Sequence, residues 1–337
     1  MLILGIETSC DETSVALLES GDGNRLEIRA NLIASQIEAH SLFGGVVPEI
    51  ASRKHLEALG PLFDLCWQET GVRPADLDLI CVTRGPGLAG ALLVGVAGGK
   101  ALSYATRVPC VGVNHVEGHI NSLFLANPEL ELPMLCLVVS GGHTDLILMR
   151  DFGDYQRLGH TRDDAVGEAF DKVGRALGLP LPGGPNLEQA ARAGNAKAFD
   201  FKASNMAPSF DFSYSGLKTA ATQTFRKHPD AVDDIAAAFQ QSAIKQLGKQ
   251  VGRALDEFAP ATSGVCGGVA ANGALRESLA QVCAGKPVAF VVPEPVLCTD
   301  NAAMIAAAGY FRARADGFPR FDVADLGFEA QSLWPIG

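Results

Sequence analysis

Short apolar runs alternate along the chain with polar, glycine-rich turns and with longer segments of helical periodicity. Apolar runs bounded by turn residues are typical of strands, and apolar positions three and four apart are typical of helices. The predicted strands are 2–6, 15–18, 79–83, 108–113, 134–139, 145–149 and 264–266. The predicted helices are 56–66, a glycine-rich segment ending at 104, 115–119, 163–172, 235–258 and one opening at 298. This alternation predicts an α/β protein.

One arrangement occurs twice. Residues 2–18 read as strand, small polar turn, strand, and residues 134–149 repeat that layout. Such turns can receive phosphate oxygens on their N–H groups, although plain hairpins with hydroxyls in water would look the same. The repeat predicts two duplicated lobes, with the polar loop 127–133 as a boundary.

Three later stretches add detail. Asp163 and Asp164 are predicted to cap the helix that starts there, since acidic residues suit a helix N-terminus. The segment 181–186 reads as a rigid turn, and 199–225 as a polar and aromatic stretch without a predicted element. The double glycine after the strand at 264–266 opens a helix, a position that suits the adenine and ribose end of a nucleotide.

Composition excludes several classes of protein. The chain has 337 residues, 47% hydrophobic, with a formal net charge of −11 and eight cysteines. It is therefore neither disordered nor a basic nucleic-acid-binding domain, so affinity for a polyanion would need a local patch or a partner. Scattered cysteines without a Cys-x-x-Cys pair indicate reduced thiols and a cytoplasmic location. The most apolar window, 85–104, is too short and interrupted for a membrane span.

Two histidines carry the candidate chemistry. His115 and His119 stand four residues apart, so on a helix both imidazoles share one face and can grip a metal ion. Paired histidines also occur as ordinary surface residues. A zinc protease needs glutamate directly after the first histidine, where this chain has Val116. Glu117 lies about 200° round the helix, which disfavours a protease.

Asp300 is the candidate third ligand. It stands with Thr299 at the start of a helix, where either residue could simply be the N-cap. Two imidazoles and one carboxylate are the set used for Fe(II), and zinc also accepts them.

Taken together, the motifs resemble a known family. They are Gly5-Ile-Glu-Thr-Ser-Cys-Asp-Glu-Thr13, Gly44-Gly-Val-Val-Pro-Glu49, His115-Val-Glu-Gly-His119, Val139-Ser-Gly-Gly-His143, Gly167-Glu-Ala-Phe-Asp171, Pro182-Gly-Gly-Pro185, Ser215-Gly-Leu-Lys-Thr219, Gly267-Gly-Val-Ala-Ala-Asn272 and Cys298-Thr-Asp-Asn301. In this order they resemble bacterial TsaD, the universal tRNA threonylcarbamoyladenosine transferase family, formerly called O-sialoglycoprotein endopeptidase. Departures are minor: Ala270-Ala271 stands where Ser-Ala is frequent, and Asn301-Ala302 where Asn-Gly is frequent.

The resemblance implies the actin-like ATPase, sugar kinase and Hsp70 (ASKHA) fold, with two duplicated lobes around a nucleotide cleft. The expected parts are a first lobe at 1–130, a second at 131–298 that binds the adenylate, and a C-terminal helix at 299–337 returning to the first. The implied reaction moves the L-threonylcarbamoyl group from threonylcarbamoyl-AMP to N6 of adenosine 37, in tRNAs that read codons beginning with A.

The family's pattern also implies site residues and partners. His115, His119 and Asp300 would bind one Fe²⁺ per subunit, or Zn²⁺. The residues implied to bind the adenylate are Val138, Val139, Ser140, Gly141, Gly142, Asp171, Gly184 and Asn272, with Glu188 a weaker candidate. The partners would be tRNA, a metal-free paralogue of the same fold (TsaB-like) and a small P-loop ATPase (TsaE-like), without a membrane.

Other roles stay open at this stage. Adenine N6 is a poor nucleophile that a base would assist, and Asp11, Glu12 and His143 are the titratable groups on the two turns. An ATPase or small-molecule kinase of the same fold could use Glu7 for Mg²⁺ but has no need of two histidines. A non-catalytic scaffold could dispense with them too. Basic residues that could hold tRNA, or simply face solvent, are Arg53, Lys54, Lys202, Lys218, Arg226 and Lys227.

Overall fold

The computed structural model describes residues 1–336, which form two compact units. The first unit contains residues 1–130, 152–154 and the chain from 296 onward, and the second contains 131–151 and 155–295. The chain therefore leaves the first unit, builds the second and returns.

The first unit is built on a five-stranded sheet in the order β3-β2-β1-β4-β5. Its strands are β1 (Leu2–Glu7), β2 (Glu12–Ser20), β3 (Leu26–Ser35), β4 (Leu79–Gly85) and β5 (Cys110–Asn114). The first three pair antiparallel, whereas β4 and β5 run parallel to β1. Its helices are α1 (Ile37–Ser41), α2 (Pro48–Thr70), α3 (Ala89–Thr106), α4 (His115–Ala126) and α11 (Ala302–Asp316).

The second unit repeats this plan with the order β10-β9-β6-β7-β8. Its strands are β6 (Met134–Val139), β7 (Thr144–Asp151), β8 (Asp154–His160), β9 (Thr262–Cys266) and β10 (Ala289–Val291). Its helices are α5 (Val166–Ala176), α6 (Gly183–Ala193), α7 (Ser215–Lys227), α8 (Val232–Phe258) and α9 (Gly273–Cys283), and the short α10 (Pro295–Cys298) lies where the chain returns. In both sheets a hairpin comes first and a parallel strand then joins its first member, so the predicted duplication is present in the topology.

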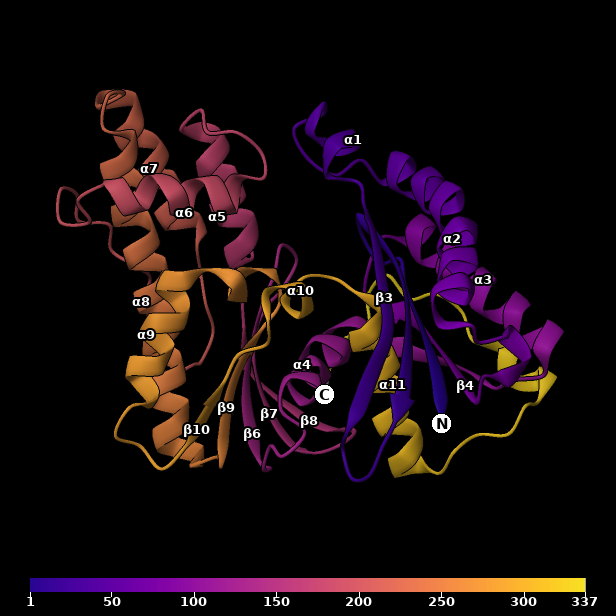
Figure 1. The fold of residues 1–337 in the computed structure, drawn as a ribbon. Helices are drawn as coiled ribbons and strands as arrows, with labels where there is room; N and C mark the ends of the chain where they lie inside the picture. The colour runs from indigo at the N-terminus through magenta and orange to yellow at the C-terminus, as the bar shows by residue number, and fades with distance from the viewer. Residues whose placement is uncertain (337) are drawn as a thin grey trace. The chain divides into compact units, whose positions relative to one another are not determined.

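The first sheet is covered on both faces. Alternate residues of a strand point to opposite sides, so Leu4 and Ile6 pack with α2 and α3 while Gly5 faces α11. Figure 1 shows α2 and α3 on one side of this sheet and α4 with α11 on the other. Burial on both faces explains why β1 and β4 read as continuous apolar runs.

α11 approaches the sheet closely at Gly5. A Cβ added at Gly5 would lie 2.0 Å from the carbonyl oxygen of Ala302. We expect Gly5→Ala to lower the free energy of unfolding by about 1–3 kcal/mol, because the backbone beside Asp300 must shift. Gly60→Ala is the control, since nothing lies within 4 Å of that added Cβ. A helix-interior alanine there should stabilise by about 0.5–1 kcal/mol in chemical denaturation. Equal stabilities for the two variants would contradict this account.

Several predictions of local structure are wrong. Residues 183–193 form helix α6, so the predicted rigid turn at 181–186 is shorter than expected. Helix α7, residues 215–227, begins inside the stretch 199–225, for which no element was predicted. Strands β3 and β8 carry polar residues and were not predicted. Within residues 1–336, every helix is too short or too polar to cross a bilayer.

Candidate metal centre and ligand-binding turns

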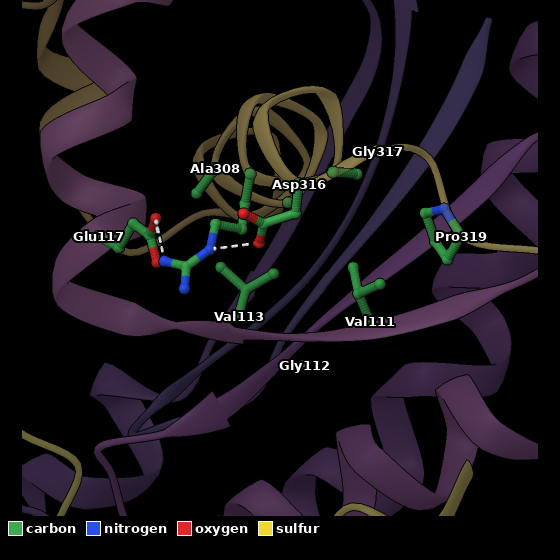
Figure 2. Close-up of a pocket in the computed structure, with 11 residues that line it drawn as sticks. Val111, Gly112, Val113, Glu117, Ala308, Asp316, Gly317 and Pro319 are labelled. Carbon is green, nitrogen blue, oxygen red and sulfur yellow. Dashed lines mark hydrogen bonds and ion pairs between the residues drawn. The ribbon is translucent and has the colours of Figure 1, made fainter. Parts of the chain in front are cut away.

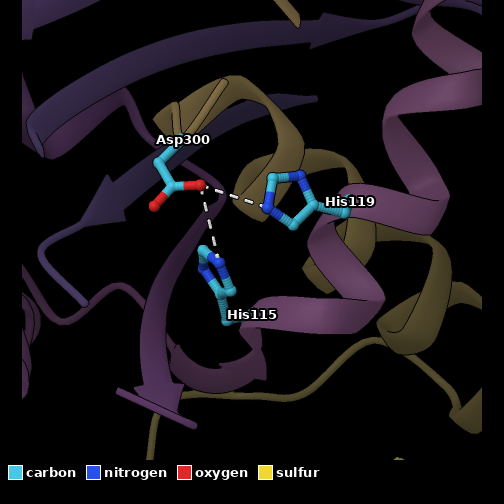
Figure 3. A group of neighbouring side chains, drawn as sticks. All are labelled: His115, His119 and Asp300. Carbon is cyan, nitrogen blue, oxygen red and sulfur yellow. Dashed lines mark ion pairs between the residues drawn. The ribbon is translucent and has the colours of Figure 1, made fainter. Parts of the chain in front are cut away.

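Three predicted ligands meet in the first unit. His115 and His119 occupy the first turns of α4, and Asp300 lies just before α11. Oδ1 of Asp300 is 3.6 Å from Nε2 of His115 and 3.1 Å from Nε2 of His119. The ligand atoms lie within 4.8 Å of one another, and Figure 3 shows the three side chains converging. The structure thus brings together residues far apart in sequence.

Helix caps place these side chains. Asn114 caps α4, its Oδ1 accepting from Val116 N at 2.9 Å and Glu117 N at 3.4 Å. Asn301 caps α11, with its Oδ1 accepting from Met304 N at 3.1 Å. The alternative left open by the sequence, that Thr299 or Asp300 is the cap, is therefore wrong. Because Asn301 caps α11, the carboxylate of Asp300 faces the histidines instead.

A second layer of residues orients His115. Its Nδ1 lies 3.1 Å from Glu7 Oε2 and 3.2 Å from Ser9 Oγ. Because a carboxylate only accepts, Nδ1 carries a proton, and Nε2 is the ring nitrogen that faces Asp300 and would bind a metal. Carboxylates that hold metal-binding histidines in this way are common in metal sites. The sequence analysis considered Glu7 only as a Mg²⁺ ligand in a kinase. The feature that could have indicated its contact with His115 is an acidic residue at the end of an apolar strand.

Charge and burial act differently on the two imidazoles. Burial lowers the pKa of His115, but the carboxylates of Asp300 and Glu7 outweigh it and raise that pKa to about 9. Burial lowers the pKa of His119, and its contact with Asp300 opposes this without reversing it. His119 is fully buried, and its Nδ1 has no hydrogen-bond partner among residues 1–336. Two imidazoles and a carboxylate fit a divalent transition metal, whose binding would displace the proton from His115.

Glu117 belongs to the other side of α4. It lines a cavity of about 180 Å³ with β5 and α11, seen in Figure 2. Its Oε1 lies 3.7 Å from Arg312 Nη1, and Arg312 Nε donates to Asp316 at 2.8 Å. Glu117 therefore does not face the three ligands, which agrees with the argument against a zinc protease.

Two of the three catalytic candidates lie in the first unit. Asp11 is in the turn between β1 and β2, and Glu12 is the first residue of β2. Burial raises the pKa of Glu12 to about 7, assisted by Asp11 and Asp300 and opposed by the Ser35 hydroxyl. Ser35 donates to Glu12 Oε1 at 2.8 Å, while the buried Oε2 has no hydrogen-bond partner among residues 1–336. His143, the third candidate, lies in the second unit.

The predicted adenylate turn follows β6, whose last residues Val138 and Val139 are buried. Ser140 Oγ accepts from the N–H groups of Gly142 at 3.3 Å and His143 at 3.1 Å. Those two groups are used within the turn, so fewer N–H groups face a ligand than the sequence suggested. Gly267 lies against it at φ +91°, and an added Cβ would lie 2.3 Å from Val139 O.

The remaining predicted adenylate residues also lie in the second unit, and each has internal contacts. Asp171 Oδ1 accepts from Gly184 N at 2.8 Å. Asn272 caps α9 by accepting from Leu275 N at 2.9 Å, and its Nδ2 donates to Gln240 at 2.9 Å. The weaker candidate Glu188 accepts from Gly273 N at 3.1 Å, next to Asn272.

Asp163, which precedes α5, caps the N-terminus of α7 and not that of α5. Asp163 Oδ1 accepts from Tyr214 N at 2.7 Å and Ser215 N at 3.3 Å, at the start of α7. Asp164 pairs with Lys172 and Lys218. The prediction that these acids cap their own helix is wrong, and Lys218 already has an anionic partner.

Asp145 supports a prediction about stability. Burial raises its pKa from 3.8 to about 6, against the opposing charge of Arg157. The native state then holds this proton more tightly than the unfolded chain, so stability falls as pH rises across that window. We expect Asp145→Asn to raise the free energy of unfolding above pH 6 by up to about 3 kcal/mol, with no gain near pH 3.5. Urea denaturation at several pH values measures this. Asp151→Asn, an exposed site on the same strand, should change stability by under about 0.5 kcal/mol; an equal gain there would contradict the prediction.

The fold places the chain in the actin-like ATPase, or ASKHA, class. HypF from T. kodakarensis matches 97% of this chain with a TM-score of 0.64 at 14% identity, and this chain spans 49% of HypF. Component A of (R)-2-hydroxyglutaryl-CoA dehydratase from Acidaminococcus fermentans matches 94% of this chain and 99% of its own, with a TM-score of 0.55 at 14% identity. At such identities the likeness concerns the fold alone, and it confirms the predicted fold class.

Sequence comparison gives the family. The family model for TsaD, tRNA N6-adenosine threonylcarbamoyltransferase, matches residues 27–307. The protein of that name from Carboxydothermus hydrogenoformans is 50% identical, with 92% of each chain covered. The one from Thermomicrobium roseum is 44% identical over 100% of this chain and 97% of its own. The chain belongs to the TsaD family of tRNA N6-adenosine threonylcarbamoyltransferases, as the motifs predicted.

Proposed function

We propose that the protein transfers the L-threonylcarbamoyl group from threonylcarbamoyl-AMP to N6 of adenosine 37, in tRNAs that read codons beginning with A. The observation that carries this is identity of 44–50% to transferases of that name over nearly the whole chain. The donor is a mixed anhydride and already activated. The reaction therefore needs no covalent enzyme intermediate, and catalysis rests on positioning and proton transfer.

His115, His119 and Asp300 are proposed to hold one Fe²⁺, with Zn²⁺ as an acceptable substitute. When bound, the ion would supply a Lewis acid and template for the donor's carbamoyl and phosphate oxygens. Glu7 and Ser9 hold the His115 ring so that Nε2 faces the ion. Burial of the two imidazoles keeps competing water away from them.

Glu12 is proposed as the base that takes a proton from adenine N6. A base works best when its pKa is close to the working pH, and burial brings the pKa of Glu12 to about 7. Its Oε2 has no hydrogen-bond partner within residues 1–336 and is free to accept a proton. Asp11 helps to hold the pKa of Glu12 at that level, and His143 stays a candidate on the adenylate side.

The adenylate is proposed to bind at the turns of the second unit. Gly141, Gly142 and Gly267 leave the backbone bare of side chains after β6, next to the buried Val138 and Val139, which suits a flat ligand and its phosphate. Asp171 and Gly184 are already joined by a hydrogen bond and would meet the ribose. The spare N–H of the Asn272 amide would reach the base.

The proposal includes three partners. tRNA follows from the family name, and the net charge of −11 means that a local basic surface or a partner must help to hold it. A metal-free paralogue and a small P-loop ATPase are proposed as the other components. A cytoplasmic location is proposed because all eight cysteines are free thiols.

The kinase reading is disfavoured by the contacts of Glu7. Its Oε2 accepts from the Thr83 hydroxyl at 2.7 Å and from His115 Nδ1 at 3.1 Å. This carboxylate is therefore not available to a magnesium nucleotide.

Reconstitution tests the proposal. Purified protein, unmodified tRNA and synthetic threonylcarbamoyl-AMP are incubated with the candidate partners, and the tRNA is digested for nucleoside mass spectrometry. We expect N6-threonylcarbamoyladenosine to appear with the complete mixture and to be absent when this protein is left out. Hydrolysis of ATP by this chain alone, without product nucleoside, would favour the ATPase reading instead.

A further inference from the structure

Residues 328–336, here called the C-terminal strap, contain no helix or strand, yet they are tied to the first unit. Gln331 N donates to Arg84 O at 2.8 Å, and Gly87 N donates to Ser332 O at 3.2 Å. Arg84 Nε also donates to Glu329 O at 2.8 Å. The strap therefore exchanges main-chain hydrogen bonds with the end of β4 and with the turn that follows it.

Side chains add to this attachment. The Arg84 guanidinium lies over the rings of Phe328 at 5.8 Å and Trp334 at 5.2 Å, and Lys100 lies over Phe328 at 4.6 Å. Lys100 also donates to the Phe328 carbonyl. Such cation–π contacts contribute about 0.5–1 kcal/mol each at partly exposed sites. A Cβ on Gly85 would lie 1.9 Å from Gln331 O, so the strap lies directly on this backbone.

The far end of the strap reaches the helix that carries the histidines. Asn114 uses both halves of its amide: Oδ1 caps α4, and Nδ2 donates to Trp334 O at 2.9 Å. Asn114 is 4% exposed and immediately precedes His115. Rotating the amide by 180° would break both interactions, so the strap fixes the cap in its working orientation.

A second route leads from the strap to the same imidazole. Gly87, whose N–H donates to Ser332 O, packs against Ser9. A Cβ added to Gly87 would lie 2.6 Å from Ser9 O. Leu88 N donates to Ser9 O at 2.8 Å. Ser9 Oγ in turn lies 3.2 Å from His115 Nδ1. The strap thus braces the residue before His115 and the hydroxyl beside its ring.

We propose that the C-terminal strap and Asn114 form a positioning device for His115, so that the strap sets how tightly the His-His-Asp cluster binds its metal. This inference rests on the metal site of the proposed function. Partners outside the ligand shell typically change metal affinity by about 10–100-fold, because they fix ring orientation before the ion arrives.

Asn114→Ser is the decisive variant. Serine is as good a helix cap as asparagine but lacks the N–H that reaches Trp334 O, and the charge is unchanged. Titration of the metal-free protein with Co²⁺ should show about 10-fold weaker binding and an altered visible spectrum. Asp322→Ala is the matched control: it removes a cap elsewhere in the C-terminal segment, where Asp322 accepts from Ala324 N at 2.9 Å. It should leave Co²⁺ affinity and spectrum unchanged even if it lowers thermal stability.

A chain ending at Gly327 completes a double-mutant cycle. If Asn114 acts through the strap, Asn114→Ser should weaken Co²⁺ binding by less than about twofold in the shortened chain. The proposal would be overturned if Asn114→Ser kept the parental Co²⁺ affinity and spectrum. It would also be overturned if Asn114→Ser and the truncation weakened Co²⁺ binding independently, so that their fold-changes multiply. If the shortened chain does not fold, the comparison of Asn114→Ser with Asp322→Ala decides. Failure of the parent to bind Co²⁺ would refute the metal site itself, and this inference with it.

Discussion

Replacing His119 by alanine should lower affinity for Fe²⁺ or Co²⁺ by more than about 100-fold and reduce formation of N6-threonylcarbamoyladenosine to a similar extent. Mutation of residues outside the ligand shell already lowers metal affinity by about 10–100-fold, and we expect loss of a ligand itself to lower it further. His119 is fully buried, with its Nε2 3.1 Å from Asp300, so alanine at this position removes one of the three ligand atoms. Metal content by mass spectrometry and product nucleoside per enzyme measure the two effects.

His228→Ala is the control for that experiment. His228 is an exposed histidine of the second unit at the end of α7, away from the predicted ligands in sequence. It should keep the parental metal content and rate. Full activity in metal-free His119→Ala protein would show that the cluster does not serve the transfer.

The second large effect is expected from Glu12→Gln. Loss of a general base typically costs about 10²–10⁴ in rate, and glutamine cannot accept the proton from N6. Burial raises the pKa of Glu12 to about 7, and only the ionised carboxylate is a base. The parental rate should therefore rise with pH through about 7 and then level off, whereas the variant should lack that rise. Single-turnover assays at fixed metal loading measure this pH dependence. They should cover pH 5.5–9, which is roughly two units either side of the expected midpoint.

Two further variants sharpen this experiment. Ser35→Ala removes the hydroxyl that lowers the pKa of Glu12, so the midpoint of the pH profile should move upward with the plateau unchanged. Glu19→Gln changes a half-exposed carboxylate of the same strand, paired with Arg29, and should leave the rate unaltered. A parental rate at neutral pH in Glu12→Gln would eliminate Glu12 as the base.

Apolar runs predicted the central strands well, because β1, β4 and β6 are buried on both faces and must be apolar throughout. β3 lies at the edge of its sheet and has mostly exposed or half-exposed residues, so its sequence lacks that signal. β8 is an edge strand of the second sheet with the same character. Sequence reasoning therefore failed at the polar edge strands β3 and β8, whereas the apolar edge strand β5 was predicted.

The residues of the candidate site also differ in how well the sequence predicts them. The spacing of His115 and His119 predicts a shared helix face because both lie on one local element. Asp300 was a candidate through its chemical type, a carboxylate that would complete a two-histidine set, and through the family resemblance, since no local pattern places a residue beside another so distant in the chain. The contact of Glu7 with His115 spans 108 positions and was missed for that reason. The adenylate residues of the second unit stay predictions.

Chain order has a consequence for how the protein matures. Two ligands are translated early, whereas Asp300 follows the whole of the second unit. On the ribosome, the histidine pair must wait for nearly the full polypeptide before its carboxylate partner emerges. A nascent chain that stalls inside the second unit would expose two imidazoles without their predicted third ligand. Metal binding at the cluster would therefore be a late step in biogenesis, and truncated products would compete poorly for the ion.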